Sequence, residues 1–441
     1  MRLIRLLKKD LAVETSVWVD RQLISVDQAR GICGLYGIDY DAIGSRSTAY
    51  HMLVNLGFLF VGIALITVIG GNWDEIPRGV RMAGLLLLTA GTHGLAIRQY
   101  LSDKDSSAVG LFLLGTLFYG ASIILIAQIY HLGEHMPDGV FLWALGSLPV
   151  AVLLGNPWLT VFNGLLALLW FFLEFWTGFL APEFVLAAFP LFLAAQLYVL
   201  MRARVSVLLF LVFLIGLVFW IEALLALMWA DERGWLVLSA EHSFVSVALF
   251  VLAHAAGHWL HGQDAAKAKD YGAVLSIWAL RFALISMFVL SFEESWQELL
   301  RADWDRLTSM WIAVAAIMAF ALWIGSKTGR LPGLFALVLV CAGTMIAVVA
   351  TQDAAAAVYF QVLDSAALIA TGIWLIMRGT SSGISHYYYL GVVTILLTAF
   401  VRYAYMIGDY LDSAILLMAL AALLLASARY WRDRQRREVL R

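Results

Sequence analysis

The chain has 441 residues, of which 62% are hydrophobic and only 14% carry a charge. Soluble globular proteins carry about 25% charged residues, so this composition excludes a water-soluble protein. The 17 tryptophans and 35 glycines are typical of membrane helices, in which aromatic rings lie at the interfaces and small residues allow close packing. The two cysteines, Cys33 and Cys341, lie far apart in different contexts, and they indicate neither a disulfide framework nor a Cys-based zinc site.

Residues 1–50 form the only sizeable polar segment, and their apolar residues recur at roughly helical spacing. Ser25 is followed three residues later by Gln28, a pattern that resembles a capping box. We therefore expect two short amphipathic helices that join around 23–25 and pack on the cytoplasmic face. Acidic residues nearly balance the basic ones here, which argues against a nucleic-acid partner.

The rest of the chain predicts an all-α polytopic membrane protein, because apolar runs of about 20 residues follow one another from residue 52 onward. We expect about 14 transmembrane helices, with a range of 12–15. They fall near residues 52–71, 80–97, 108–129, 139–155, 158–175, 183–201, 205–229, 242–261, 271–292, 307–325, 331–350, 355–377, 387–407 and 411–429. Gly155-Asn156-Pro157 separates two of them into a hairpin, since proline disfavours helix just before it. The transmembrane domain thus covers 51–429, and 430–441 form a basic tail.

Charge distribution predicts the orientation of these helices. Most of the 29 lysines and arginines fall on the side of the N-terminus, whereas the acidic residues favour the opposite side. The positive-inside rule then places both termini in the cytoplasm. The acidic stretch Glu293–Arg306 is expected to be an outer loop. No cleavable signal is indicated, because the first long apolar run begins only after residue 50.

Two polar clusters at the predicted outer surface are the first candidate site. One lies between the first two spans, and the other follows the third span, where Gln128, His131 and His135 share a helical face if the helix continues that far. We hypothesise that they converge on one pocket for an anionic headgroup or carboxylate. The alternatives are that Asp74 and Glu75 neutralise the arginines and that the other residues only make interfacial hydrogen bonds. The candidate residues are Asn72, Trp73, Arg78, Arg81, Gln128, Tyr130 and His131.

A family resemblance rests on these same segments. The stretches 71–81, 125–132 and 143–149, together with the N-terminal segment 18–25, resemble the bacterial membrane-protein family known as domain of unknown function 2157. The resemblance covers roughly the first 160 residues. It implies a bacterial inner-membrane protein, and it brings no activity, substrate or catalytic residue with it.

The second candidate site is a row of histidines on the predicted eighth span. His254, His258 and His261 are spaced by four and three residues, which places three imidazoles on one helical face. Metal or haem ligation requires imidazoles that converge in this way, so the row is a weak metal candidate. The alternative is that these histidines simply lie at the cytoplasmic end of a helix, where a positive charge is favourable.

The third candidate is a set of ionisable residues within predicted spans. A charged side chain that faces lipid near the middle of a bilayer costs about 3 kcal/mol or more, so each should pair or line a hydrated path. A transporter's substrate or proton path and a set of structural ion pairs both fit. The residues are Glu174, Glu222, Arg281, Asp364 and Arg402.

Three classes of function remain. The number of spans, the buried charges and the absence of a phosphate-binding loop favour a transporter- or flippase-like protein for a small polar, anionic or lipid-linked substrate. The alternatives are a scaffold or sensor with a membrane partner subunit, and a glycosyltransferase-like membrane enzyme that acts on a lipid-linked substrate. An enzyme is not favoured, since no G-x-S-x-G elbow occurs, and no cofactor is indicated. The lipid bilayer is the one partner that the sequence requires.

Overall fold

The computed structural model describes residues 14–16, 18–35, 40, 56–58, 60–64, 77–102, 105–130, 135–178, 180–229, 242–302, 304, 308–329 and 331–405. Within these residues every regular element is a helix, as the apolar composition predicts. The helices fall into two compact units. Unit 1 comprises Met1–Leu236 with Asp264–Tyr271, and unit 2 comprises Val237–Gln263 with Gly272–Arg441.

The N-terminal segment of unit 1 contains the predicted pair of short helical pieces. Helix α2 (Val26–Leu35) follows a turn after helical residues 18–20. The capping box is confirmed: the Gln28 backbone N–H donates to Ser25 Oγ at 3.2 Å, and the Ser25 N–H donates to Gln28 Oε1 at 2.8 Å. Cys33 Sγ lies 3.4 Å from Thr15 Oγ1, and both residues are buried. The two pieces therefore pack against each other.

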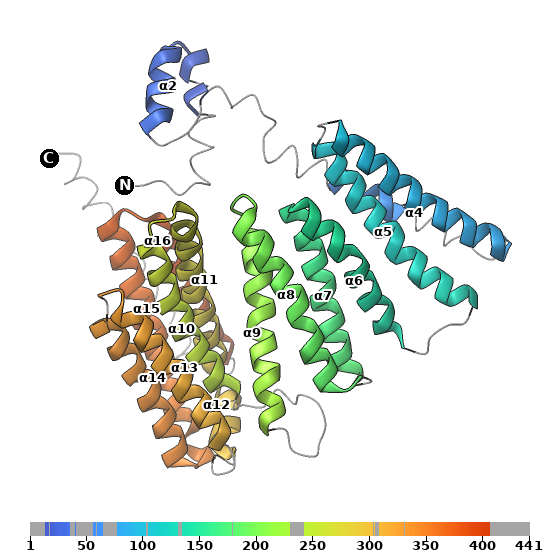
Figure 1. Cartoon of the computed structure of the whole chain (residues 1–441). Helices are drawn as coiled ribbons and strands as arrows, with labels where there is room; N and C mark the ends of the chain where they lie inside the picture. Colours follow the sequence, from blue (N-terminus) through green and yellow to red (C-terminus); the bar gives the residue numbers. More distant parts are fainter. Residues whose placement is uncertain are drawn as a thin grey trace. The chain divides into compact units, whose positions relative to one another are not determined.

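Six long helices form most of the remaining described part of unit 1 (Figure 1). They are α4 (Arg78–Leu101), α5 (Asp105–Tyr130), α6 (Met136–Leu154), α7 (Pro157–Thr177), α8 (Pro182–Arg202) and α9 (Val207–Trp229). Helix α4 packs along α5, while α7 packs against α6, α8 and α9. The buried side chains of α7 and α8 include Trp170, Phe171, Phe189 and Phe192. Helix α7 is thus the central helix of this group.

The turn between α6 and α7 has the chemistry that Gly155-Asn156-Pro157 predicts. Gly155 adopts a left-handed conformation with φ 55°, which a glycine tolerates and which ends α6. The Asn156 side chain then caps α7 by accepting hydrogen bonds from the N–H groups of Trp158 and Leu159. Pro157 occupies the first position of α7, where no intrahelical N–H bond is lost. The predicted hairpin is confirmed.

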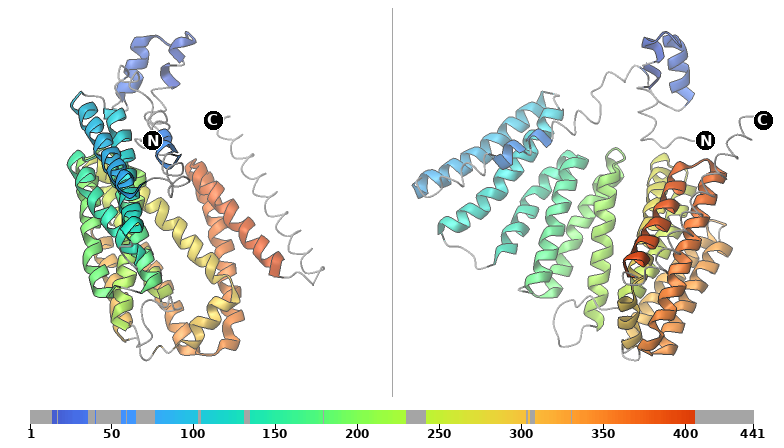
Figure 2. Two further views of the ribbon diagram at one scale, coloured as in Figure 1. Left: turned by 90° about the vertical axis from the view of Figure 1, so that its right-hand side faces the viewer. Right: turned by 180° about the vertical axis from the view of Figure 1, so that it is seen from behind.

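Unit 2 is also built from helices, and Figure 2 shows α15 and α16 side by side in its right-hand view. Helix α10 packs against α13 and α14, and α12 packs against α15. A Cβ on Gly391 of α16 would lie 2.5 Å from the Gly372 carbonyl oxygen of α15, so only glycine permits this close approach. The helices are α10 (His242–Gly262), α11 (Ala266–Leu290, of which the part up to Tyr271 belongs to unit 1), α12 (Glu293–Arg301), α13 (Thr308–Ser326), α14 (Leu331–Thr351), α15 (Ala357–Ser382) and α16 (Ser385–Tyr405), with a 3-10 turn, η4 (Ala354–Ala356).

The acidic stretch Glu293–Arg306, expected to be an outer loop, contains a short helix. Residues 293–301 form the amphipathic helix α12, and its Trp296, Leu299 and Leu300 are buried. The apolar side chains recur at intervals of three and four residues, so one face of a short helix can bury them against α15. The many charged residues of this segment made its helical periodicity hard to recognise in the sequence.

Ten helices in the described part of the chain are long and apolar enough to cross a membrane: α4 to α11, α14 and α15. Helices α13 and α16 occupy two further predicted spans, whereas most of 52–71 and all of 411–429 lie outside the described residues. The protein is thus a multi-helix membrane protein. The count of about 14 spans, the cytoplasmic termini and the 430–441 tail remain predictions.

Candidate functional site

The candidate site in unit 2 lies where the end of α13 meets α10. Helix α13 ends in a turn in which the Lys327 N–H donates to the Ile324 carbonyl and the Thr328 N–H donates to the Gly325 carbonyl. Gly329 follows with φ 67°, a left-handed conformation that reverses the chain before α14 begins. This turn brings Thr328 and the first turn of α14 to the α10 histidines.

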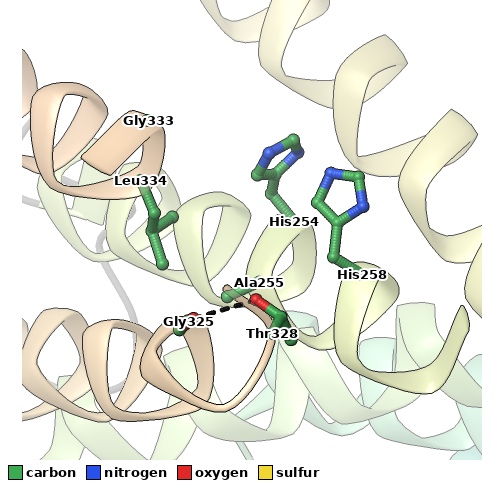
Figure 3. Close-up of a pocket in the computed structure, with 7 residues that line it drawn as sticks. All are labelled: His254, Ala255, His258, Gly325, Thr328, Gly333 and Leu334. Atoms are coloured by element: carbon green, nitrogen blue, oxygen red, sulfur yellow. Dashed lines mark hydrogen bonds between the residues drawn. The ribbon is translucent and has the colours of Figure 1, made fainter. Parts of the chain in front are cut away.

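A cavity of about 370 Å³ lies between these elements, and Figure 3 shows its lining. His254 and His258 project from successive turns of α10, and their ring centroids lie 4.6 Å apart with the rings perpendicular. Thr328 completes the polar lining, with its hydroxyl donating to the Gly325 carbonyl at 2.9 Å. Ala255, Gly333 and Leu334 form the apolar part of the lining. The volume suits a small molecule.

A second cavity of about 350 Å³ shares His258 and Thr328 with the first. His261, Gln263 and Lys327 also line it, and Lys327 Nζ lies 5.7 Å from the centre of the exposed Trp323 ring. Among the described residues that line the two cavities there is no carboxylate. The combined lining therefore favours a negatively charged ligand.

The histidine row was predicted as a weak metal candidate. His254 and His258 are in ring contact, but no group of three metal-ligating atoms converges around them in the part of the chain that the structure describes. Because His261 lies at the next turn, the row extends along the helix axis instead of surrounding a point. The three histidines therefore form an elongated polar lining along α10.

The predicted intramembrane charge Glu174 has polar neighbours. It is fully buried near the end of α7, and Trp170 Nε1 donates to its Oε1 at 3.2 Å. Its Oε2 lies 3.4 Å from His135 Nε2. Phe141 of α6 packs on Trp170 with ring centroids 4.6 Å apart.

His135 lies at the residue before α6, not on a continuation of α5. His135 therefore does not share a helical face with Gln128, because it is the extended N-cap residue of the next helix. His131 itself lies outside the described residues.

Sequence reasoning missed the two other polar residues around His135. Asp138 Oδ1 lies 3.1 Å from His135 Nδ1, and Thr177 Oγ1 lies 3.3 Å from His135 Nε2. One turn of α6 separates His135 from Asp138, a spacing that could have signalled the contact. Thr177 is brought in by the α6–α7 hairpin, which no local pattern encodes.

The remaining intramembrane charges lie among polar partners in unit 2. Arg402 donates to the Ser291 carbonyl oxygen, which also accepts from Gln361 Nε2 at 3.3 Å, and Arg402 interacts electrostatically with Asp364. Arg281 lies 3.5 Å from His386 Nδ1 and 4.8 Å from the centre of the Trp278 ring.

Glu222, like Glu174, belongs to unit 1. It lies on α9 and is buried. Five ionisable residues predicted within spans are thus all located on described helices, and none of them lines the histidine cavities.

The predicted outer pocket is only partly visible, because Asn72 and Trp73 lie outside the described residues. Arg78 and Arg81 occupy the first turn of α4, and Arg78 is exposed. The Tyr130 hydroxyl, at the end of α5, donates to Met82 Sδ at 3.4 Å. The start of α4 and the end of α5 therefore meet.

Comparisons with known proteins bear on the N-terminal third of the chain. Residues 16–160 match a family model described as "Predicted membrane protein (DUF2157)". This match confirms the resemblance that the N-terminal segments indicate. The matched range runs from the capping-box segment through the α6–α7 turn into the start of α7. No curated protein and no solved structure matches the chain.

Proposed function

We propose that the protein is a membrane transport protein for a small anionic substrate, which binds in the histidine cavities of unit 2. The observation that carries the proposal is the cavity of about 370 Å³ lined by His254, His258 and Thr328. Imidazole can donate a hydrogen bond to an anion, and it keeps an N–H donor in its neutral form.

The position of the cavities supports transport over simple packing. Helices α10 and α14, which supply most of the lining, are long and apolar enough to cross a membrane. A polar cavity bounded by such helices is expensive unless it is hydrated or filled by a ligand. The exposed Lys327 at the edge of the second cavity would draw an anion toward it.

The residues of the predicted outer pocket would provide a second binding site for the same anion. Arg78, Arg81, Gln128 and Tyr130 lie at the ends of α4 and α5 that the Tyr130–Met82 contact joins. An arginine at an interface suits a carboxylate or phosphate group, so these residues would meet the anion or an anionic headgroup at the outer surface.

Binding can be tested on detergent-purified protein by calorimetric titration with inorganic phosphate and, separately, with succinate. We expect saturable binding of at least one of them, weakened at least tenfold in the His254→Ala/His258→Ala double variant. Arg378→Gln is the control, because it removes an exposed positive charge at a site away from the cavity lining. Circular dichroism and size-exclusion profiles check that each variant is folded.

Transport is tested with the same proteins in liposomes. Uptake of the radiolabelled anion that binds should exceed that of protein-free liposomes and should fall in the double histidine variant. Binding without uptake would favour the sensor alternative. If neither anion binds, or if the double variant binds both as wild type does, the proposal is wrong.

A further inference from the structure

We propose that His135, Asp138 and Glu174 form a binding site for a divalent transition-metal ion, with zinc as the best-matched ion. This inference concerns unit 1 and does not depend on the proposed transport function. One ligand atom from each of the three residues lies within 4.8 Å of the others, and no other such group of three was found among the described residues.

The distances fit a metal that draws its ligands slightly inward. Zinc binds nitrogen and oxygen ligands at about 2.0–2.2 Å, which places neighbouring ligand atoms of a tetrahedral site about 3.4 Å apart. Here each ring nitrogen of His135 faces one carboxylate: Nδ1 lies 3.1 Å from Asp138 Oδ1, and Nε2 lies 3.4 Å from Glu174 Oε2. Because one imidazole nitrogen binds the ion, zinc on Nε2 beside Glu174 Oε2 requires the Asp138 carboxylate, whose side chain is 56% exposed, to turn from Nδ1 toward that ion.

A second observation points to a ligand at this place. Glu174 is fully buried, and its Oε2 has no hydrogen-bond partner among the described residues although it faces the His135 ring. A buried carboxylate oxygen without a hydrogen bond is costly unless a positive charge meets it. A metal ion supplies that charge and bonds directly to Oε2.

The surroundings supply the orienting contacts that metal ligands use. Trp170 Nε1 donates to the other oxygen of Glu174 at 3.2 Å and so fixes the plane of the carboxylate. Thr177 Oγ1, 3.3 Å from His135 Nε2, can hold a water molecule in the fourth position. Gly178 adopts a left-handed conformation and ends α7, and its N–H donates to the Glu174 carbonyl at 2.8 Å. Glu174 and Thr177 therefore both lie in the last turn of α7.

The ligand set also selects the kind of ion. Imidazole suits zinc and its transition-metal neighbours, whereas calcium and magnesium prefer oxygen ligands only. Calcium binds with six to eight ligands, more than three protein groups and one water can provide. The site would therefore take zinc in preference to calcium, and it would join the start of α6 to the end of α7.

The test uses tag-free full-length protein in detergent, stripped with a chelator and titrated calorimetrically with zinc chloride and with calcium chloride. We expect about one zinc per chain and no saturable calcium binding. Glu174→Gln and Asp138→Asn should each weaken zinc binding at least tenfold. Glu183→Gln is the matched control, because it removes a carboxylate in the first turn of α8, outside the proposed ligand set.

Two further measurements distinguish this site from zinc binding elsewhere on the chain. Zinc should raise the melting temperature of the wild type and of Glu183→Gln but not that of Glu174→Gln, which reports on binding even if the variant is less stable. The His254→Ala/His258→Ala variant should keep its zinc, whereas loss of zinc there would place the metal on α10. Absence of zinc binding in the wild type, or equal binding in Glu174→Gln, would overturn the proposal.

Discussion

Asn163 joins α7 to α6 within the apolar core of unit 1: its Nδ2 donates to the Ala144 carbonyl at 2.6 Å and to Ser147 Oγ at 2.8 Å. The side chain is fully buried. Hydrogen bonds between membrane helices contribute about 0.6–1.7 kcal/mol each, because the separated helices find other partners. Two such bonds make this a specific contact between the two helices of the hairpin.

We expect Asn163→Ala to lower the free energy of unfolding by about 1–2 kcal/mol, because it removes both donors and leaves the Ala144 carbonyl with one partner fewer. Unfolding in a series of dodecyl sulfate fractions, followed by circular dichroism, measures the change. Ser381→Ala, at an exposed position with a hydrogen bond only to its own helix, is the control. Equal stability of the two variants would contradict the inferred role of Asn163.

Gly391 is the second test position. Its replacement by alanine places a Cβ 2.5 Å from the Gly372 carbonyl oxygen, so α15 and α16 must separate, and we expect a loss of about 1–3 kcal/mol. Gly343→Ala on α14 meets no atom within 4 Å and should be neutral or stabilising. The melting temperatures of the two alanine variants in detergent provide the comparison, and identical values would exclude tight packing at Gly391.

Arg402 and Asp364 should show thermodynamic coupling. Arg402→Gln removes the charge opposite Asp364 and the guanidinium donor to the Ser291 carbonyl, and we expect a destabilisation of about 1–3 kcal/mol. Adding Asp364→Asn removes the carboxylate that has lost its positive partner and should recover part of the loss. A double-mutant cycle on unfolding free energies measures this coupling, and strictly additive effects would show that the two residues are independent.

The contact between the start of α4 and the end of α5 can be tested by cross-linking. Cysteines at Arg81 and Gln128, in a chain with Cys33→Ser and Cys341→Ser, should be joined by a bifunctional reagent that spans about 15 Å, the size range of the ligands such pockets hold. The Tyr130–Met82 contact is the reason for this expectation. Cysteines at Arg81 and Leu101, at opposite ends of α4, are the negative control.

Orientation in the membrane is tested by labelling single cysteines from outside intact cells. We expect a cysteine at Glu134 to react with a membrane-impermeant reagent and one at Gln263 to react only after lysis, since the charge distribution places these positions on opposite sides. Labelling of both from the same side would contradict the prediction of about 14 spans.

Local chemistry determined what could be predicted from the sequence. The turn at Gly155-Asn156-Pro157 and the Ser25–Gln28 cap were predictable, because glycine, proline and capping side chains act within a few residues. The long helices were predictable from runs of about 20 apolar residues. The position of His135 was not predictable, because a periodic pattern cannot show where α5 ends when the next residues are also compatible with helix.

The residues that each candidate side chain contacts could not be predicted from local sequence patterns. Glu174 was a candidate from its charge alone, but its contact with His135 depends on the hairpin. The α10 histidines were recognised from their spacing, whereas Thr328 and Leu334 enter the cavity through the packing of α13 and α14. Contacts between helices distant in sequence thus decided what each candidate residue touches.

The hairpin of α6 and α7 has a consequence for biosynthesis. The polar groups of α7 find their partners on the segment made immediately before it: Asn163 on Ala144 and Ser147, and Glu174 beside His135. A growing chain that enters the bilayer with both helices together never has to expose this amide or this carboxylate to lipid. We therefore expect the translocon to release α6 and α7 as a pair, before α8 and α9 are synthesised to cover them.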